Sequence, residues 1–289
     1  MLQFIANGVV VGAVVAVTAV GLTLVYSILK LTNFAHGDMV TFGAYVALLL
    51  NLSLGLDIWW TLPPAFLAGA LLGVLGDRLI WSRMRRRQAG SVSFIVASIG
   101  LALALRNLIV FFFGAQTQHF RLPVEMRQPL GPLPVKLTPD EVHVIVAAVV
   151  LFAGVHALLR YTTIGRAMRA MADNPSLSWV SGVDVDRVIT WTWILGGGLA
   201  AVGGVLYGMI RPIDPNMGWF LLLPMFAAII LGGIGNAYGA AVGGVLIGII
   251  QEASVMFLPA EYRLAVGFLA MIAVLLTYPR GLFGERSLT

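Results

Sequence analysis

The stretch that decides the fold is residues 5–29, IANGVVVGAVVAVTAVGLTLVYSIL, which contains no charged side chain. An α-helix needs about 20 consecutive apolar residues to cross the hydrocarbon core of a bilayer, so this run is long enough to span it. The residues before it, 1–4, include no basic side chain. We therefore expect a retained helix here and not a cleaved signal peptide.

Further apolar runs of similar character follow along the chain, at 37–54, 60–81, 92–113, 141–159, 188–210, 219–234, 236–257 and 262–278. The run 219–234 is short, contains Pro224 and ends in Gly232 and Gly233, so it is predicted either to cross the membrane or to form a re-entrant or broken helix. We predict an all-α fold, a polytopic transmembrane helical bundle with 8–9 membrane segments, forming a single domain over residues 1–289.

The composition excludes a soluble protein. Hydrophobic residues make up 59% of the chain, charged residues only 11%, and the mean hydropathy is +0.93. Ordinary soluble domains contain about 25% charged residues, which they need to cover their cores. The formal net charge is +5. Because the basic residues lie between the apolar runs, they indicate membrane topology and a lipid bilayer as the environment, with no nucleic acid partner.

The distribution of Lys and Arg predicts the orientation. Most of these side chains lie in the loop 82–91, in the segment 160–187 and in the tail, which carries Arg280 and Arg286. Basic residues are enriched in cytoplasmic loops. Nine crossings would place all three segments inside, with the N-terminus outside and the C-terminus in the cytoplasm.

Residues 114–140 form the longest segment expected outside. They contain five prolines, Pro123, Pro129, Pro132, Pro134 and Pro139. This density of proline excludes a long helix and favours an extended, ordered connection. The segment would form part of an external vestibule or partner-contact surface, or it would be a simple connector.

Small residues recur at four-residue spacing, as in Gly8 with Gly12 and Gly244 with Gly248. Lipid gives apolar helices no hydrophobic reason to associate, so they pack through small residues that allow close backbone approach. We expect most of these glycines to pack helices within the chain, with a subunit interface as the alternative.

The segment 160–187 is the most informative polar stretch. Its residues 164–173 are predicted to form a short helix with Met168, Met171 and Ala172 on one face. Methionine adapts to irregular surfaces, so this face suits a groove on another protein. The alternative is a solvated connector between two spans.

A break and a second short helix are predicted within the same segment. The sequence Asp173-Asn174-Pro175 ends the first helix, because proline disfavours a helical conformation in the residue before it. Ser176 is predicted to cap the second helix, which would end by Gly182. The two helices together would form a cytoplasmic docking element.

Polar side chains within the apolar runs or at their ends are candidates for function, because charge in the bilayer is costly. They are Asn33, His36, Asp38, Arg106 and Glu252. His36 and Asp38 could belong to a metal or proton relay site, but a polar helix start with Asp38 near the positive end of the helix dipole is the favoured interpretation. The depths of Arg106 and Glu252 in their runs allow an ion pair between them.

Motifs for enzyme chemistry are missing from the sequence. It contains no HExxH and no Walker-type glycine-lysine loop, and the absence of cysteine excludes thiolate ligands. We therefore expect no catalytic residues, no cofactor and no metal. Any use of ATP would come from a separate subunit.

Four regions resemble one family of transport proteins. They are GLTLVY (21–26) followed by NFAHGDM (33–39), GRAMRAMADNP (165–175) followed by Gly182, GGIGN (232–236) before the run that reaches Glu252, and PAEYR (259–263) with PRGLFG (279–284). The chain resembles the permease subunits of bacterial ABC importers for branched-chain amino acids, whose relatives import other neutral amino acids, urea and short amides. The matching regions extend over nearly the whole chain.

The resemblance implies a complex with several partners. These are two cytosolic ATP-binding subunits, a second permease subunit that would make a heterodimer, and a periplasmic solute-binding protein that docks on the outer face, which includes 114–140. The complex would lie in the bacterial inner membrane. The resemblance also makes 160–187 the loop that couples to the ATPases, through Gly165, Arg166, Met168, Arg169, Ala170, Met171, Asp173, Asn174, Pro175 and Gly182.

Other functions remain as alternatives. An importer for urea or short amides would have the same architecture. A channel or secondary carrier would work alone and would need no docking element at 160–187. A membrane-embedded enzyme is the third alternative, and the sequence offers it no converging catalytic groups.

Overall fold

The structure is a computed structural model of the whole chain, and it describes residues 1–123, 125–129, 134–278 and 281–283. Pro132, Arg280, Arg286 and half of the motif 279–284 lie outside the described residues. The elements are α1 (Leu2–Leu29), α2 (Ala35–Ser53), α3 (Ile58–Gly76), the π-helix η1 (Asp77–Trp81), α4 (Ser82–Arg86), α5 (Ser91–Phe113), β1 (Gln128–Pro129), β2 (Lys136–Leu137), α6 (Pro139–Tyr161), α7 (Thr163–Asp173), α8 (Pro175–Val180), α9 (Val185–Ile210), α10 (Met217–Gly232), α11 (Ala237–Ser254), the 3-10 helix η2 (Ala260–Tyr262) and α12 (Arg263–Thr277).

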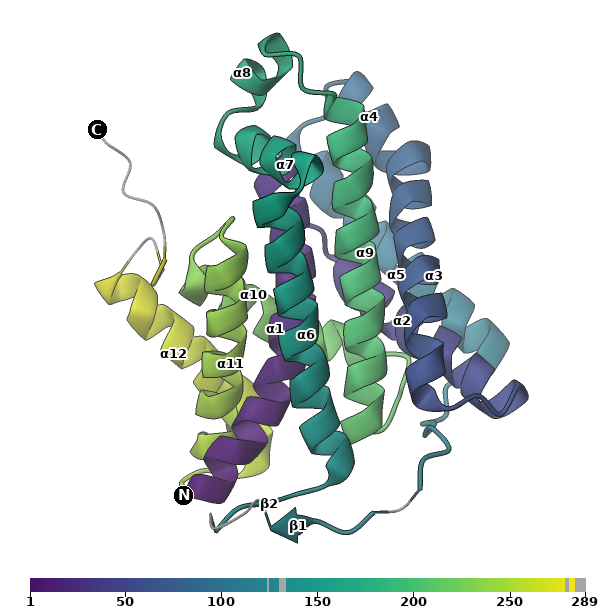
Figure 1. Cartoon of the computed structure of the whole chain (residues 1–289), viewed down its shortest axis with the longest axis vertical. Coiled ribbons are helices and arrows are strands. Elements are labelled where there is room, and N and C mark those ends of the chain that lie inside the picture. The colour runs from purple at the N-terminus through teal and green to yellow at the C-terminus, as the bar shows by residue number, and fades with distance from the viewer. Residues whose placement is uncertain (124, 130–133, 279–280, 284–289) are drawn as a thin grey trace.

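The described elements form a helical bundle, which confirms the all-α polytopic fold (Figure 1). Seven helical runs in the described part of the chain are long and apolar enough to cross a membrane: α1, α3 continued through α4, α5, α6, α9, α11, and η2 with α12. The helices α2 and α10 complete the bundle but do not meet that criterion. The predicted number of membrane segments is therefore approximately right.

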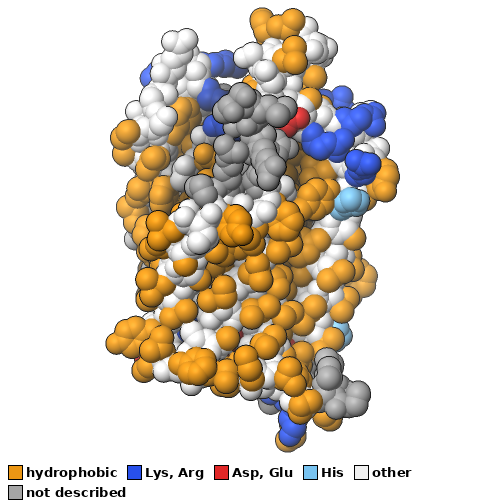
Figure 2. All heavy atoms as spheres, turned by 90° about the vertical axis from the view of Figure 1, so that its left-hand side faces the viewer, with side chains coloured by type: hydrophobic (Ala, Val, Ile, Leu, Met, Phe, Trp, Pro, Cys, Tyr) orange, Lys and Arg blue, Asp and Glu red, His pale blue; other side chains and the backbone are white. Residues whose placement is uncertain are grey.

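The two ends of the bundle differ in character. Met1 and the β1–β2 hairpin lie at one end, called here the N-terminal end, and α4, α7 and α8 lie at the other, called the basic end (Figure 1). Figure 2 shows hydrophobic side chains over the middle of one face, with Lys and Arg gathered mainly toward the basic end. This is the distribution expected of a multi-pass membrane protein.

Helices α1 and α9 form the centre of the bundle, and close glycine contacts hold them there. A Cβ added at Gly12 of α1 would lie 2.7 Å from Cα of Val245 in α11, and one at Gly21 would lie 2.9 Å from the carbonyl oxygen of Gly196 in α9. Gly8, Gly244 and the other paired glycines named above also contact backbone or side chains of this chain. They therefore act as intramolecular packing positions.

Helix α2 begins inside the bundle, and this was not predicted. The Phe34 N–H donates to Oγ of Ser98 at 3.2 Å, and Nε2 of His36 lies 3.1 Å from the carbonyl oxygen of Thr18, in the middle of α1. The run 37–54 was predicted to cross completely. The polar residues at its start instead form the first turn of a helix that begins partway along α1.

Helix α10 is the short, uncertain run at 219–234, and it also begins beside α2. The Gly218 N–H donates to Oγ1 of Thr41 at 3.0 Å, and a Cβ on Gly218 would overlap the carbonyl group of Gly37. The starts of two helices therefore meet within the bundle. In transporters such discontinuous helices commonly line the substrate path.

The connection is extended over most of the described part of 114–138, as its prolines predicted, and Pro139 begins α6. β1 and β2 pair antiparallel, with Gln128 opposite Leu137, and a β-bridge joins Gln118 to Ile213. The loop 82–91 was predicted too long, because the helix continues through η1 to Arg86. Arg83, Arg85 and Arg86 are therefore helical residues.

Candidate functional site

Helix α7 turns sharply from the end of α6 and lies across the basic end of the bundle. Oγ1 of Thr162 accepts from the Gly165 N–H at 3.0 Å and donates to the carbonyl oxygen of Leu158 at 2.6 Å. A Cβ at Gly165 would overlap the Leu158 carbonyl and lie 2.6 Å from Cα of Leu159. Glycine at this position is therefore needed for the α6–α7 turn.

The methionine face of α7 is buried against its own chain. Met168 and Met171 are 1% and 3% exposed and belong to the hydrophobic core, and α7 contacts α1, α6 and α9. Arg169 donates from Nη1 to the carbonyl oxygen of Leu159. The prediction that this face fits a groove on another protein is wrong, because the turn at Thr162 folds it back onto the bundle.

Helix α8 follows at once and has a different cap from the one predicted. Oδ1 of Asn174 accepts from the Leu177 N–H at 3.0 Å, and Pro175 occupies the first helical position. Asn174 is therefore the N-cap, and Ser176 is a residue of the first turn. Gly182, with a φ of +81°, lies just beyond the helix in the left-handed conformation that glycine tolerates.

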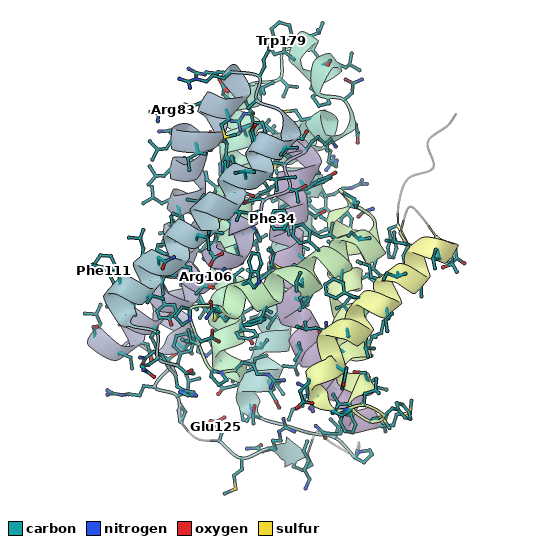
Figure 3. The ribbon with its side chains drawn as sticks, turned by 180° about the vertical axis from the view of Figure 1, so that it is seen from behind. Phe34, Arg83, Arg106, Phe111, Glu125 and Trp179 are labelled. Carbon is teal, nitrogen blue, oxygen red and sulfur yellow. The ribbon has the colours of Figure 1, made fainter. Side chains whose placement is uncertain are left out.

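Three large apolar residues of α8 are exposed at this end of the bundle. Leu177, Trp179 and Val180 are 63%, 72% and 77% exposed. Figure 1 shows α8 projecting beyond the rest of the bundle, and in Figure 3 Trp179 lies at its tip, at the same end as Arg83. These residues were missed as candidates, although three large apolar side chains in a short polar segment could have indicated them.

A second candidate region lies within the bundle. Arg106 of α5 donates from Nε to Oδ1 of Asp38 at 3.0 Å and from Nη2 to Oδ2 at 3.1 Å. The Asp38 carboxylate is fully buried, and the Arg106 side chain is 17% exposed. The guanidinium also lies 5.3 Å from the centroid of the Trp219 ring on α10. The ion pair therefore joins α2 to α5 beside the start of α10.

The ion pair that the depths of Arg106 and Glu252 allowed does not form. Glu252 accepts a hydrogen bond from Nη2 of Arg211 at 3.3 Å and forms an ion pair with Arg263, whose Nη2 lies 3.3 Å from Oε2. Glu252 lies near the N-terminal end of the bundle, on α11. Depth along the apolar runs therefore did not identify the partner of either residue.

Asn33 and His36 form the start of α2. Oδ1 of Asn33 accepts from the Ala35 N–H at 3.1 Å, and His36 contacts the carbonyl of Thr18. Nδ1 of His36 and Nδ2 of Asn33 are buried without a hydrogen-bond partner in the described part of the chain. In that same part, no three His, Asp or Glu side chains converge as metal ligands would.

The chain has extensive similarity to known permeases. Residues 4–275 match the family described as branched-chain amino acid transport system / permease component. The high-affinity branched-chain amino acid transport system permease protein LivH of Escherichia coli K12 is 31% identical, over 98% of this chain and 96% of the relative.

Other organisms supply further relatives. The probable branched-chain amino acid transport permease protein LivH of Methanocaldococcus jannaschii is 32% identical, over 92% of this chain and 87% of the relative. The ribose import permease protein RbsC of Haemophilus influenzae is 23% identical, over 90% and 80%. No solved structure matches the chain significantly. With its helical bundle and its matched residues 4–275, the chain belongs to the family of branched-chain amino acid transport system permease components.

Proposed function

We propose that this chain is the membrane-spanning permease subunit of an ATP-driven importer for branched-chain amino acids. Separate cytosolic subunits bind and hydrolyse ATP, a second permease subunit completes the pathway, and a solute-binding protein delivers the substrate. The chain forms one permease domain over residues 1–289 and carries out no catalysis itself. Residues 160–187 are its coupling loop, and 114–140 is its external loop.

The observation that carries this proposal is the exposed apolar surface of α8. Three large apolar side chains, Leu177, Trp179 and Val180, project into the space beyond the bundle, and burying them would gain free energy. Aromatic residues are enriched among those that dominate protein interfaces. A carrier that works alone would have no use for this surface, whereas an importer needs a contact through which ATPase movement reaches the membrane helices.

The basic end faces the cytoplasm in this proposal. Arg83, Arg85, Arg166 and Arg169 lie at or beside that end, and basic residues are retained on the cytoplasmic side. The chain then lies in the bacterial inner membrane, with its N-terminus outside and its C-terminus on the cytoplasmic side. The solute-binding protein docks at the N-terminal end, where the described part of 114–140 and the short outer connections lie.

The substrate class follows from the relatives of highest identity. Those that are 28–32% identical over nearly the full length are named for branched-chain amino acids. The relative named for ribose is 23% identical. The similarity therefore favours leucine-like amino acids over the alternative of urea and short amides.

The test is transport by the whole complex. The complex is purified through a tag at Met1 and reconstituted in proteoliposomes, with the solute-binding protein on the outer side. Leucine, isoleucine and valine should accumulate only when ATP is present on the side of the ATP-binding subunits. Accumulation without ATP would indicate a carrier and contradict the proposal. Uptake of urea in preference to leucine would overturn the proposed substrate.

A further inference from the structure

An ion pair at apolar depth in the bundle calls for a role beyond packing. Helix α5 is apolar along most of its length, yet it carries Arg106 and, next to it, the exposed Asn107. The amide of Asn107 donates only back to its own helix, to the carbonyl oxygen of Leu103 at 2.8 Å. Polar groups facing lipid at this depth are costly, so this side of α5 is expected to face a polar path or a partner.

The geometry of the pair leaves part of the guanidinium available. Asp38 occupies the edge formed by Nε and Nη2. Within the described residues, no hydrogen bond involves Nη1 of Arg106, and the side chain keeps 17% exposure. Guanidinium groups hold carboxylates in a two-pronged arrangement. The edge formed by Nη1 and the second N–H of Nη2 can therefore receive a second carboxylate while Asp38 stays bound.

Apolar surface lies next to this edge. Trp219 covers the guanidinium from α10, and it and Phe220 are 37% and 56% exposed. Figure 3 shows Arg106 between α5 and α10 on the face seen from behind. A ligand with a carboxylate and an aliphatic side chain would find a partner for each within this region.

We propose that Arg106, held in place by Asp38, forms the intramembrane site that binds the carboxylate of a zwitterionic amino acid during its passage. The substrate carboxylate binds the Nη1 edge of Arg106, while Asp38 keeps its two hydrogen bonds to the guanidinium. The pair is neutral as a whole, so the site receives a neutral zwitterion without a net charge in the membrane. This inference rests on the proposed function, because it assumes an amino acid substrate.

A purely structural ion pair predicts a different pattern of mutant effects. Removing one partner of a buried pair leaves an uncompensated charge and is strongly destabilising, whereas removing both is often neutral. A structural role therefore predicts that the double variant recovers transport. A substrate-binding role predicts that it does not, because the guanidinium is then missing.

The experiment uses the complete importer in proteoliposomes, with Asp38→Asn, Arg106→Gln and the double variant. Leucine uptake and ATP hydrolysis stimulated by the loaded solute-binding protein are both measured. We expect uptake to fall by about tenfold or more in all three, the size expected for lost hydrogen bonds to charged groups. Stimulated ATP hydrolysis should stay at the wild-type level in the double variant, which leaves no uncompensated buried charge. Wild-type uptake in the double variant would overturn the inference.

A second variant covers the case in which single neutral substitutions fail to assemble. Arg106→Lys keeps the charge and its pairing with Asp38 but has no fork for a second carboxylate. It should assemble normally and still lose leucine uptake. If it transports leucine as the wild type does, the inference is wrong.

The matched control is another two-pronged Asp–Arg pair at the basic end. Arg85 donates to Asp77 at 2.8 and 3.0 Å, outside the region proposed here. The double variant Asp77→Asn with Arg85→Gln should transport leucine like the wild type. If the wild-type complex carries no leucine at all, the proposed function fails. If it carries leucine and all Asp38 and Arg106 variants do too, only this inference fails.

Discussion

Helices α7 and α8 are adjacent in sequence and lie at the same end of the bundle, yet they use their apolar residues in opposite ways. Met168 and Met171 of α7 are 1% and 3% exposed, whereas Trp179 and Val180 of α8 are 72% and 77% exposed. One helix is anchored in the permease, and the other presents its apolar side chains to the solvent.

The difference shows how a loop can transmit movement. A docking helix that is attached only through flexible chain would move without moving the bundle. Here α7 is packed against α1, α6 and α9, and the single residue Asn174 separates it from α8. In the proposed importer, a displacement of α8 by a bound ATPase would therefore reach the core of the permease through α7.

The largest expected effect comes from breaking the anchor. Gly165→Leu places a side chain where the Leu158 carbonyl and the Leu159 backbone already lie, so α7 must shift away from α6. We expect leucine uptake to be abolished and the melting temperature of the purified permease to fall. Gly154→Leu, on the neighbouring helix α6, is the control, because nothing lies within 4 Å of a Cβ at Gly154. Equal uptake in the two variants would show that transport does not depend on the packing of α7 against α6.

A smaller effect, a loss of stability, is expected from a cavity beneath α7. Met168→Ala removes a buried side chain and should lower the free energy of unfolding by about 2–5 kcal/mol, as for other large-to-small core substitutions. Thermal unfolding of the purified protein measures it. Met126→Ala is the control, since Met126 is 87% exposed. A melting temperature unchanged by Met168→Ala would contradict the burial of this face.

Removing an exposed apolar side chain of α8 should affect docking and not stability. Trp179→Ala is expected to weaken binding of the ATP-binding subunits by about 30-fold, which corresponds to about 2 kcal/mol for an interface hot spot. Co-purification at graded subunit concentrations gives the affinity. Trp60→Ala is matched in exposure, because Trp60 is 73% exposed, and it lies in the first turn of α3, far from α8. If both substitutions weaken binding equally, α8 has no special role.

The smallest effect should come from the cap between the two helices. Asn174→Ala removes the acceptor for the Leu177 N–H and is expected to cost about 1 kcal/mol of helix stability, giving about fivefold weaker docking. Ser176→Ala should have little effect, because Ser176 is not the cap. The same co-purification assay compares them. A larger loss for Ser176→Ala would restore the original assignment of the cap.

Much of the fold could be predicted from the sequence, because hydropathy and length decide which segments are transmembrane helices. The start of α2 could not be predicted in this way. Its position depends on Phe34 reaching Ser98 and on His36 reaching Thr18, and these contacts join segments far apart in the chain. A hydropathy pattern records how apolar a run is but not where it begins along its neighbours.

The candidate sites divide in the same way. Helical spacing correctly placed Met168 and Met171 on one face, but only the turn at Thr162 decides that this face meets the permease itself. Asp38 and Arg106 were both noted as costly charges, and their pairing across 68 positions required the three-dimensional packing of α2 against α5. Local pattern identifies such residues, and tertiary structure assigns their partners.

The most direct test of the central claim is whether ATP-binding subunits cover α8. The chain contains no cysteine, so Val180→Cys introduces a single reactive thiol on α8, and Leu54→Cys, at a residue 65% exposed near the other end, provides the control. Maleimide labelling of the permease is measured with and without bound ATP-binding subunits. With subunits at about ten times their dissociation constant, labelling of Val180→Cys should slow by about tenfold, while Leu54→Cys is unaffected. Labelling of Val180→Cys at an unchanged rate in a complex that retains its ATP-binding subunits would contradict the account.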